Sequence, residues 1–143
     1  MKFFSYIKYF FFIAYNWNMR IAWHITRQEI DGEKKYEIIS VQASGVIVDG
    51  FKMQHSGNSD MNDLAAIKIY NSRDIIIRNN ILDDNFFGIY TQYGTNCTIS
   101  NNQIHASGKP ELQNGNGIHC WKSDSMRVIG NKVNGHRDGM YFE

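Results

Sequence analysis

The stretch Ile75-Ile76-Ile77-Arg78-Asn79-Asn80 decides the fold, because an apolar run that ends in Asn or Gly recurs at 46–50, 97–102 and 126–131. A second element, Gly88-Ile89-Tyr90-Thr91, recurs at 117–120 and 139–142, and at 66–69 with alanine in place of glycine. Internal self-similarity of this kind indicates stacked repeats, each of which buries its apolar side chains only against its neighbours.

The copies are evenly spaced apart from one recurrent addition. Equivalent positions of the Gly-Ile element, 67, 89, 118 and 140, are 22, 29 and 22 residues apart, and those of the apolar run, 48, 77, 99 and 128, are 29, 22 and 29 apart. The additional residues always follow the apolar run, in 54–65 and 105–116. Ile38 precedes Val48 by the same ten residues that separate 67 from 77, which extends the array back to about residue 30.

This spacing predicts an all-β fold, a right-handed parallel β-helix of about four to five coils of 22 residues, with two insertions that project from one edge. Strand alternation assigns side chains to faces. We expect the inward ladders Val46/Ile75/Cys97/Met126, Val48/Ile77/Ile99/Val128, Ile67/Ile89/Ile118/Met140 and Ile69/Thr91/Cys120/Phe142. We expect the outward ladders Lys68/Tyr90/His119/Tyr141 and Tyr70/Gln92/Trp121/Glu143.

One corner of each coil carries an asparagine, at Asn80, Asn102 and Asn131. Asparagine tolerates a left-handed backbone, and stacked amides hydrogen-bond from one layer to the next. We therefore expect a ladder of amides along this corner.

Composition limits the functions that the chain can have. Fifteen Lys and Arg residues against fourteen Asp and Glu residues give a formal charge of +1 in 143 residues, so no strong field gathers nucleic acid or an anionic membrane. Residues 30–143 form the predicted repeat domain. Residues 1–29 carry an aromatic apolar stretch with lysines, for which three interpretations stay open: a degraded export signal, an anchor, or residues foreign to the domain.

An aromatic outward face is the candidate binding surface, and its members are Tyr70, Tyr90, His119, Trp121 and Tyr141. Aromatic rings beside hydrogen-bonding groups suit the docking of a protein partner or stacking on sugar rings. The outward strand positions supply one carboxylate, Glu143, whereas glycoside hydrolysis needs a facing pair of carboxylates. We therefore predict a protein that is not an enzyme.

Soft and imidazole side chains are plentiful, at Met53, His55, Met61, His105, His119, Cys120, Met126, His136 and Met140. Imidazole, thioether and thiolate are the ligands that select copper over hard cations. Several of these residues fall in inward ladders, where methionine and free cysteine fill space. His55 and His105 each open one insertion and His119 lies on a neighbouring face, so these three histidines are the candidate copper ligands.

Certain motifs resemble the NosD family, the β-helical accessory proteins of nitrous oxide reductase. They are Asn-Gly-Ile-His-Cys-Trp at 116–121 and Gly-His-Arg-Asp-Gly at 135–139, supported by residues 49–53, 63–67 and 86–90. The resemblance covers residues 30–143. It implies a periplasmic protein that works with an ABC transporter and a copper chaperone to mature the copper centres of nitrous oxide reductase.

The chain departs from this family at both ends. Residues 1–29 do not look like its export signal, and members continue beyond the position of Glu143, so the sequence is expected to be a fragment. The alternative function is a carbohydrate-binding or polysaccharide-processing β-helix, because the same coil pattern occurs in many sugar-binding proteins.

Overall fold

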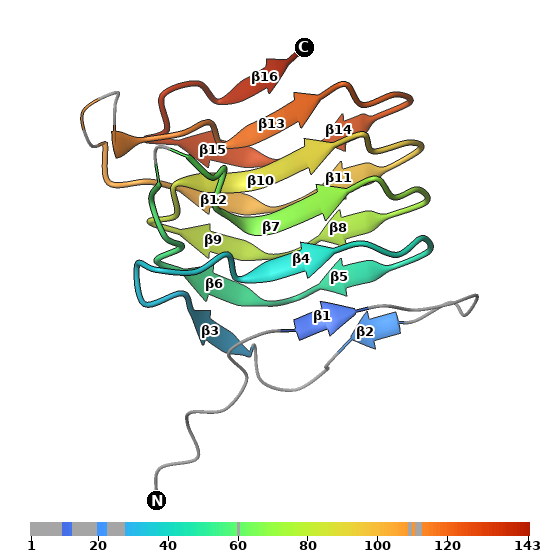
Figure 1. Cartoon of the computed structure of the whole chain (residues 1–143), viewed down its shortest axis with the longest axis horizontal. Coiled ribbons are helices and arrows are strands. Elements are labelled where there is room, and N and C mark those ends of the chain that lie inside the picture. Colours follow the sequence, from blue (N-terminus) through green and yellow to red (C-terminus); the bar gives the residue numbers. More distant parts are fainter. Residues whose placement is uncertain (1–9, 13–19, 23–27, 60, 109, 111–112) are drawn as a thin grey trace, which may run out of the picture.

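In a computed structural model, the chain forms a parallel β-helix whose coils stack along one axis (Figure 1). The structure describes residues 10–12, 20–22, 28–59, 61–108, 110 and 113–143, with side chains from residue 28 onward. Each complete coil has three short strands, which pair in parallel with their counterparts in the coils above and below. The predicted fold class, an all-β right-handed parallel β-helix, is confirmed.

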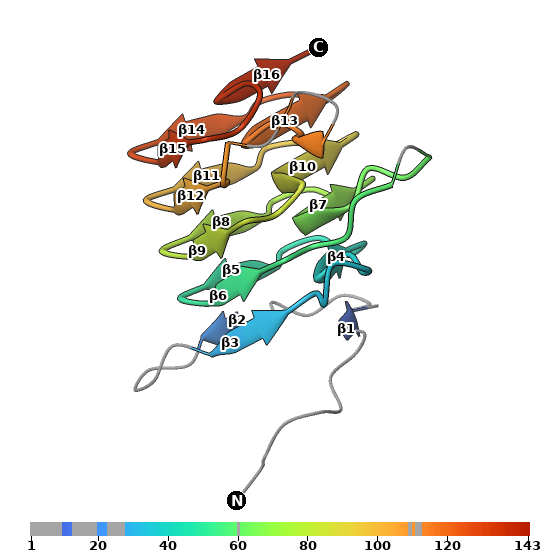
Figure 2. The same cartoon turned by 90° about the vertical axis from the view of Figure 1, so that its left-hand side faces the viewer.

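Three sheets run along the stack (Figure 2). The first contains, in spatial order, β1 (Phe10–Phe12), β4 (Ile39–Val41), β7 (Ala65–Tyr70), β10 (Phe87–Gln92), β13 (Ile118–Trp121) and β16 (Met140–Phe142). The second contains β2 (Arg20–Ala22), β5 (Ile47–Asp49), β8 (Ile76–Arg78), β11 (Thr98–Ser100) and β14 (Arg127–Ile129). The third contains β3 (Glu29–Asp31), β6 (Lys52–Gln54), β9 (Ile81–Asp83), β12 (Gln103–His105) and β15 (Lys132–Asn134).

The third sheet is an element that the sequence pattern does not predict. Each of its strands has three residues and a single inward side chain, and these side chains are Ile30, Met53, Leu82, Ile104 and Val133. One inward residue produces no alternation, so the period of two that identifies a strand is absent. A coil consequently has three sides instead of the two strands that the sequence indicates.

The predicted inward ladders form the core, except in the last coil, where Met140 and Phe142 are more than half exposed. Ile89 lies in register between Ile67 and Ile118, and Ile77 pairs with Val48 and Ile99. These side chains have no measurable exposure, so each coil removes its apolar surface from water by stacking on the next.

The register is wrong at one point of the prediction. The spacing places Ile38 in the ladder of Ile67, but Ile39 pairs with Ile67 and Val41 with Ile69. A shift of one residue moves every side chain of a strand to the opposite face. Ser40 therefore points outward beside Lys68.

The asparagine ladder is present as predicted. Asn80 Nδ2 donates to Asn102 Oδ1 at 3.0 Å, and Asn102 Nδ2 donates to Asn131 Oδ1 at 2.9 Å. The left-handed backbone, however, belongs to the residue before each amide, with φ of 57° at Asn79, 55° at Asn101 and 65° at Gly130. The chain thus turns at one residue, and the side-chain amide of the next residue forms the hydrogen bonds between coils.

Both insertions leave the stack between the third and the first sheet, after β6 and after β12, so they project from one edge as expected (Figure 1). Near the N-terminus, β1 pairs with β4 and β2 pairs with β5. Most of residues 1–29 lie outside the described residues, and the interpretation of this segment stays a prediction. Within the described part of the chain, no helix has the length and apolarity needed to cross a membrane.

Candidate functional site

The outward side of the first sheet, called the outer face below, carries both predicted outward ladders. Tyr90 pairs with Lys68 on one side and with His119 on the other, and His119 pairs with Tyr141. Gln92 lies in register between Tyr70 and Trp121. The structure therefore brings all five predicted binding residues onto one surface.

These five residues differ in how much of the side chain reaches solvent. Tyr70 is 43% exposed and Tyr141 41%, whereas Tyr90 is 5% and His119 8% exposed. Tyr90 is buried because Phe87 packs against it, with ring centroids 5.1 Å apart. Phe87 precedes the Gly-Ile element and escapes the repeat pattern. It converts the middle of the outer face into a small second core that holds the exposed rings in place.

His119 is fixed by hydrogen bonds at both ring nitrogens. Asn116 Nδ2 lies 3.1 Å from Nδ1, and Glu143 Oε1 lies 3.1 Å from Nε2. With the Asn116 amide in this orientation, Nδ2 donates to Nδ1 of a neutral ring, which leaves Nε2 as the donor to Glu143. The ring also packs between Tyr90 and Tyr141 in tilted contacts, at centroid distances of 4.8 and 5.2 Å.

The two insertions bound the outer face at its edge. In the first insertion, the Asp63 carbonyl oxygen accepts from Lys68 Nζ at 3.2 Å. Burial, together with the negative charge of Asp63 and a hydrogen bond to it, raises the pKa of the Tyr90 phenol above its ordinary value. In the second insertion, Asn116 holds His119. Both insertions thus lie at the edge of the outer face and contact residues in its middle.

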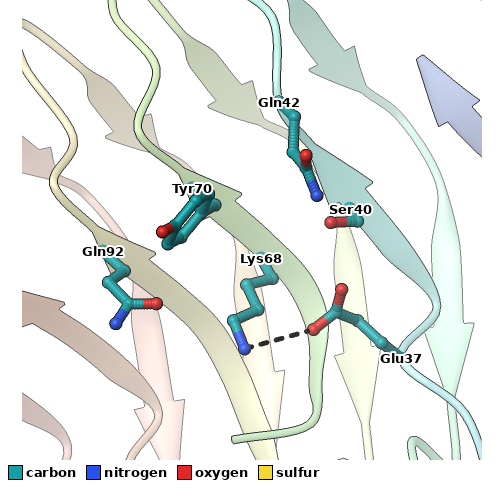
Figure 3. A pocket seen from close by; sticks show the side chains of 6 residues that line it. All are labelled: Glu37, Ser40, Gln42, Lys68, Tyr70 and Gln92. Atoms are coloured by element: carbon teal, nitrogen blue, oxygen red, sulfur yellow. Dashed lines mark ion pairs between the residues drawn. The ribbon is translucent and has the colours of Figure 1, made fainter. Parts of the chain in front are cut away.

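A hollow of about 270 Å³ opens on the same face, among the side chains of β4, β7 and β10 (Figure 3). It is lined by Glu37, Ser40, Gln42, Lys68, Tyr70 and Gln92. Glu37 Oε2 forms an ion pair with Lys68 Nζ at 3.7 Å, and burial raises the pKa of the Glu37 carboxyl against the opposing influence of that ammonium group. Such a lining both donates and accepts hydrogen bonds, which suits a polar ligand or a peptide backbone.

Sequence reasoning missed three of these residues, Glu37, Ser40 and Gln42. The cause is the register error, because alignment of Ile38 with Ile67 turns Ser40 inward. The alternation of Ile39 and Val41 around Ser40 was the available signal.

An aromatic strip continues from the hollow along the axis of the stack. Tyr93, 41% exposed, lies edge-on to Tyr70 with ring centroids 6.3 Å apart, and edge-on to Trp121 at 5.0 Å. Lys122 Nζ lies over the Trp121 ring, 4.5 Å from its centroid. Tyr93 was missed because it follows β10, at a turn position with φ of 56°, outside the strand pattern.

The three predicted copper ligands do not meet. His55 Nδ1 lies 3.0 Å from Asp31 Oδ2 and His105 Nδ1 lies 3.0 Å from Asp83 Oδ1, both at the third sheet, while His119 lies on the first. Among the described residues, no group of three or more His, Cys, Asp or Glu side chains is placed to hold a metal ion. The residues therefore do not fit a shared copper site, and copper binding by each of them stays a prediction.

The cysteines face the core. Cys97 and Cys120 are both buried, and burial raises the pKa of each thiol. A buried, protonated thiol behaves as a small apolar side chain, in agreement with its place in an inward ladder.

Comparisons with known proteins agree with this architecture. The sequence profile of a family described as "Right handed beta helix region" matches residues 22–142. The chain is also similar to the "Probable ABC transporter binding protein NosD" of Pseudomonas aeruginosa, with 27% identity over 113 residues. That alignment covers 78% of this chain and 26% of the relative, so the chain spans about a quarter of the length of the curated relative it matches. No solved structure matches significantly. The resemblance to NosD is confirmed.

Proposed function

Because the chain belongs to the right-handed β-helix family and is similar to NosD, we propose that it is a non-catalytic binding scaffold that works with an ABC transporter in maturing the copper centres of nitrous oxide reductase. By the same resemblance, we place it in the periplasm with a copper chaperone and the reductase as further partners. Copper is the cargo of this process.

One observation carries the proposal, namely the outer face. Its exposed rings, Tyr70 and Tyr141, stand on a sheet stiffened by the buried pair Phe87 and Tyr90. A protein partner gains most from large apolar side chains that are already held in their bound conformation, because little conformational entropy is then lost on binding. The name of the relative, a probable ABC transporter binding protein, supports the same kind of role.

A second candidate is carbohydrate binding, favoured by the hollow. Its amide, hydroxyl and carboxyl groups match the hydroxyls of a sugar, and Tyr70 supplies a ring for stacking. A glycan array tests this candidate. Binding that disappears in Tyr70→Ala supports it, and the absence of any retained glycan removes it.

Binding to the partners tests the main proposal. The full chain is immobilised and exposed in turn to the detergent-solubilised transporter, the copper chaperone and nitrous oxide reductase. We expect the Tyr70→Ala/Tyr141→Ala double variant to weaken transporter binding by about tenfold or more. The matched control, Arg127→Ala/Lys132→Ala, changes exposed residues of the second and third sheets. Equal loss in both variants, or no binding by the native chain, contradicts the proposal.

A further inference from the structure

The aromatic strip of Tyr70, Tyr93 and Trp121 has a defined period. Its three rings belong to three successive coils, one on β7, one directly after β10 and one on β13. Neighbouring parallel strands lie about 4.8 Å apart, so Tyr70 and Trp121 are separated by about 9.6 Å along the axis. A polyproline II helix has three residues per turn with a rise of about 3.1 Å each, which gives about 9.3 Å per turn. The strip therefore repeats at the pitch of this helix.

The three rings form one continuous aromatic surface. Tyr93 stands edge-on to both of its neighbours, at interplanar angles of 77° to Tyr70 and 66° to Trp121, and its ring centroid lies 6.3 and 5.0 Å from theirs. Aromatic side chains gathered in this way line the surfaces that bind the prolines of a polyproline II segment.

Hydrogen-bond donors lie beside the strip. A polyproline II backbone makes no internal hydrogen bonds, so its carbonyl groups seek donors from the partner. The side chains of Gln42, Gln92 and Tyr70, which carry two amides and a hydroxyl, line the hollow (Figure 3). Within the described part of the chain, no side-chain hydrogen bond engages either amide.

Lys122 supplies a positive charge at the far end of the strip, where the Glu143 carboxylate is engaged by His119 Nε2 at 3.1 Å. Lys122 lies over Trp121 and forms no ion pair with any residue that the structure describes. A cation held on an aromatic face beside a binding groove attracts a carboxylate of the ligand. The Lys122 ammonium group is thus complementary to an acidic residue next to the proline-rich segment.

We propose that the aromatic strip docks a polyproline II segment of a partner protein, with prolines three residues apart at Tyr70 and Trp121 and an acidic residue at Lys122. The inference deepens the proposed function and rests on it for the view that the outer face binds a protein. It names the chemistry of the bound segment.

Fluorescence anisotropy of a labelled peptide, Pro-Pro-Ala-Pro-Pro-Glu-Glu, with the full chain tests the inference. We expect Trp121→Ala or Tyr93→Ala to weaken binding about tenfold and Lys122→Glu to weaken it several-fold. Lys132→Ala, an exposed change on the third sheet, should leave binding unchanged. Circular dichroism of each variant excludes unfolding as the cause.

Several results overturn the inference. They are no binding of the peptide, equal binding of its D-proline counterpart, equal binding by the strip variants, and displacement of the peptide by cellohexaose or oligogalacturonate, which would assign the strip to glycans. The transporter assay with the same proteins separates this inference from the proposed function. If the native chain binds the transporter and the peptide does not compete, the inference fails and the proposed function stands. If the peptide binds and the transporter does not, the proposed function fails.

Discussion

Asn102 donates from its side-chain amide to Asn131 Oδ1 at 2.9 Å, across the boundary between two coils. The same side chain accepts from the Asn80 backbone N–H at 3.0 Å and donates to the Ile77 carbonyl at 3.1 Å. Three successive coils are therefore joined through one buried amide. Hydrogen bonds in such chains strengthen one another, and an unpaired buried group is costly.

Replacement of Asn102 by alanine should lower the free energy of unfolding by about 2–4 kcal/mol, because it leaves the buried Asn80 N–H without its acceptor and removes the bonds that the amide makes to the Ile77 carbonyl and to Asn131 Oδ1. Urea denaturation followed by circular dichroism measures the change. Gln103→Ala, an exposed change at the next residue, should shift it by less than about 0.5 kcal/mol. A similar effect of both substitutions would contradict the role given to the amide ladder.

The glycine that begins the Gly-Ile element is sterically required in one coil and not in another. A Cβ at Gly88 would lie 2.5 Å from the Gly117 carbonyl oxygen and 2.5 Å from Ile104 Cγ2, whereas a Cβ at Gly139 meets nothing within 4 Å. Gly88→Ala should therefore destabilise the protein by about 1–3 kcal/mol or more, and Gly139→Ala should be close to neutral. Thermal melts of the two variants measure the difference in stability. Equal melting temperatures would show that the close approach of the Gly117 carbonyl to Gly88 does not require glycine there.

Acid should weaken the packing of the second insertion through His136. Its Nδ1 lies 3.1 Å from the Gly115 carbonyl, Nε2 is buried without a partner, and burial lowers the pKa of this imidazole from the ordinary value of 6.5. Below about pH 6.5 the unfolded chain consequently binds more protons than the native chain, so stability falls as the pH decreases through this window.

Urea denaturation at several pH values between about 5.5 and 7.5 measures this effect. His136→Gln keeps a donor for Gly115 and cannot titrate, so its stability should depend less steeply on pH than that of the native protein. Parallel pH curves for the two proteins would assign the acid sensitivity to other groups.

In a polypeptide of these 143 residues, β14, β15 and β16 each have one unpaired edge, and Ile129, Met140 and Phe142 are more than half exposed. Unpaired strand edges with apolar side chains recruit other chains. Static light scattering should therefore detect aggregates, and Met140→Lys/Phe142→Lys should reduce them. A monodisperse native monomer would show that this end is not adhesive.

The predicted copper ligands are tested by calorimetric titration of Cu(I) into the native protein and a His55→Ala/His105→Ala/His119→Ala variant. We expect weaker binding by the variant. The three side chains lie on separate parts of the fold. The decreases in Cu(I) binding caused by the three single substitutions should therefore be additive. Equal affinity of native and triple-variant proteins would remove these histidines from copper binding.

The sequence predicts the core of the fold because that core is periodic. Ile67, Ile89 and Ile118 recur at fixed spacing, and their register follows directly from it. The third sheet was missed because one inward residue per strand, such as Leu82, gives no alternation. The hollow was missed in part because a single-residue slip at Ile39 reversed the face of Ser40.

Only part of the candidate site could be predicted from the sequence, because only part of it is built from repeated positions. The positions of Tyr70 and Trp121 come from strand alternation. The burial of Tyr90 depends on Phe87, whose equivalent in β7 is the small residue Ala65, and the place of Tyr93 depends on the turn after β10. Contacts made by side chains that the other coils do not share are tertiary, so no period in the sequence records them.

Site-specific photocrosslinking in intact cells tests the central claim, that the outer face contacts an ABC transporter. A photoreactive phenylalanine derivative replaces Tyr141 on the outer face in one variant and Lys132 on the third sheet in another, both exposed positions. We expect a crosslink to a transporter subunit from position 141 and none from position 132. A crosslink from position 132 alone, or from neither position, would contradict it.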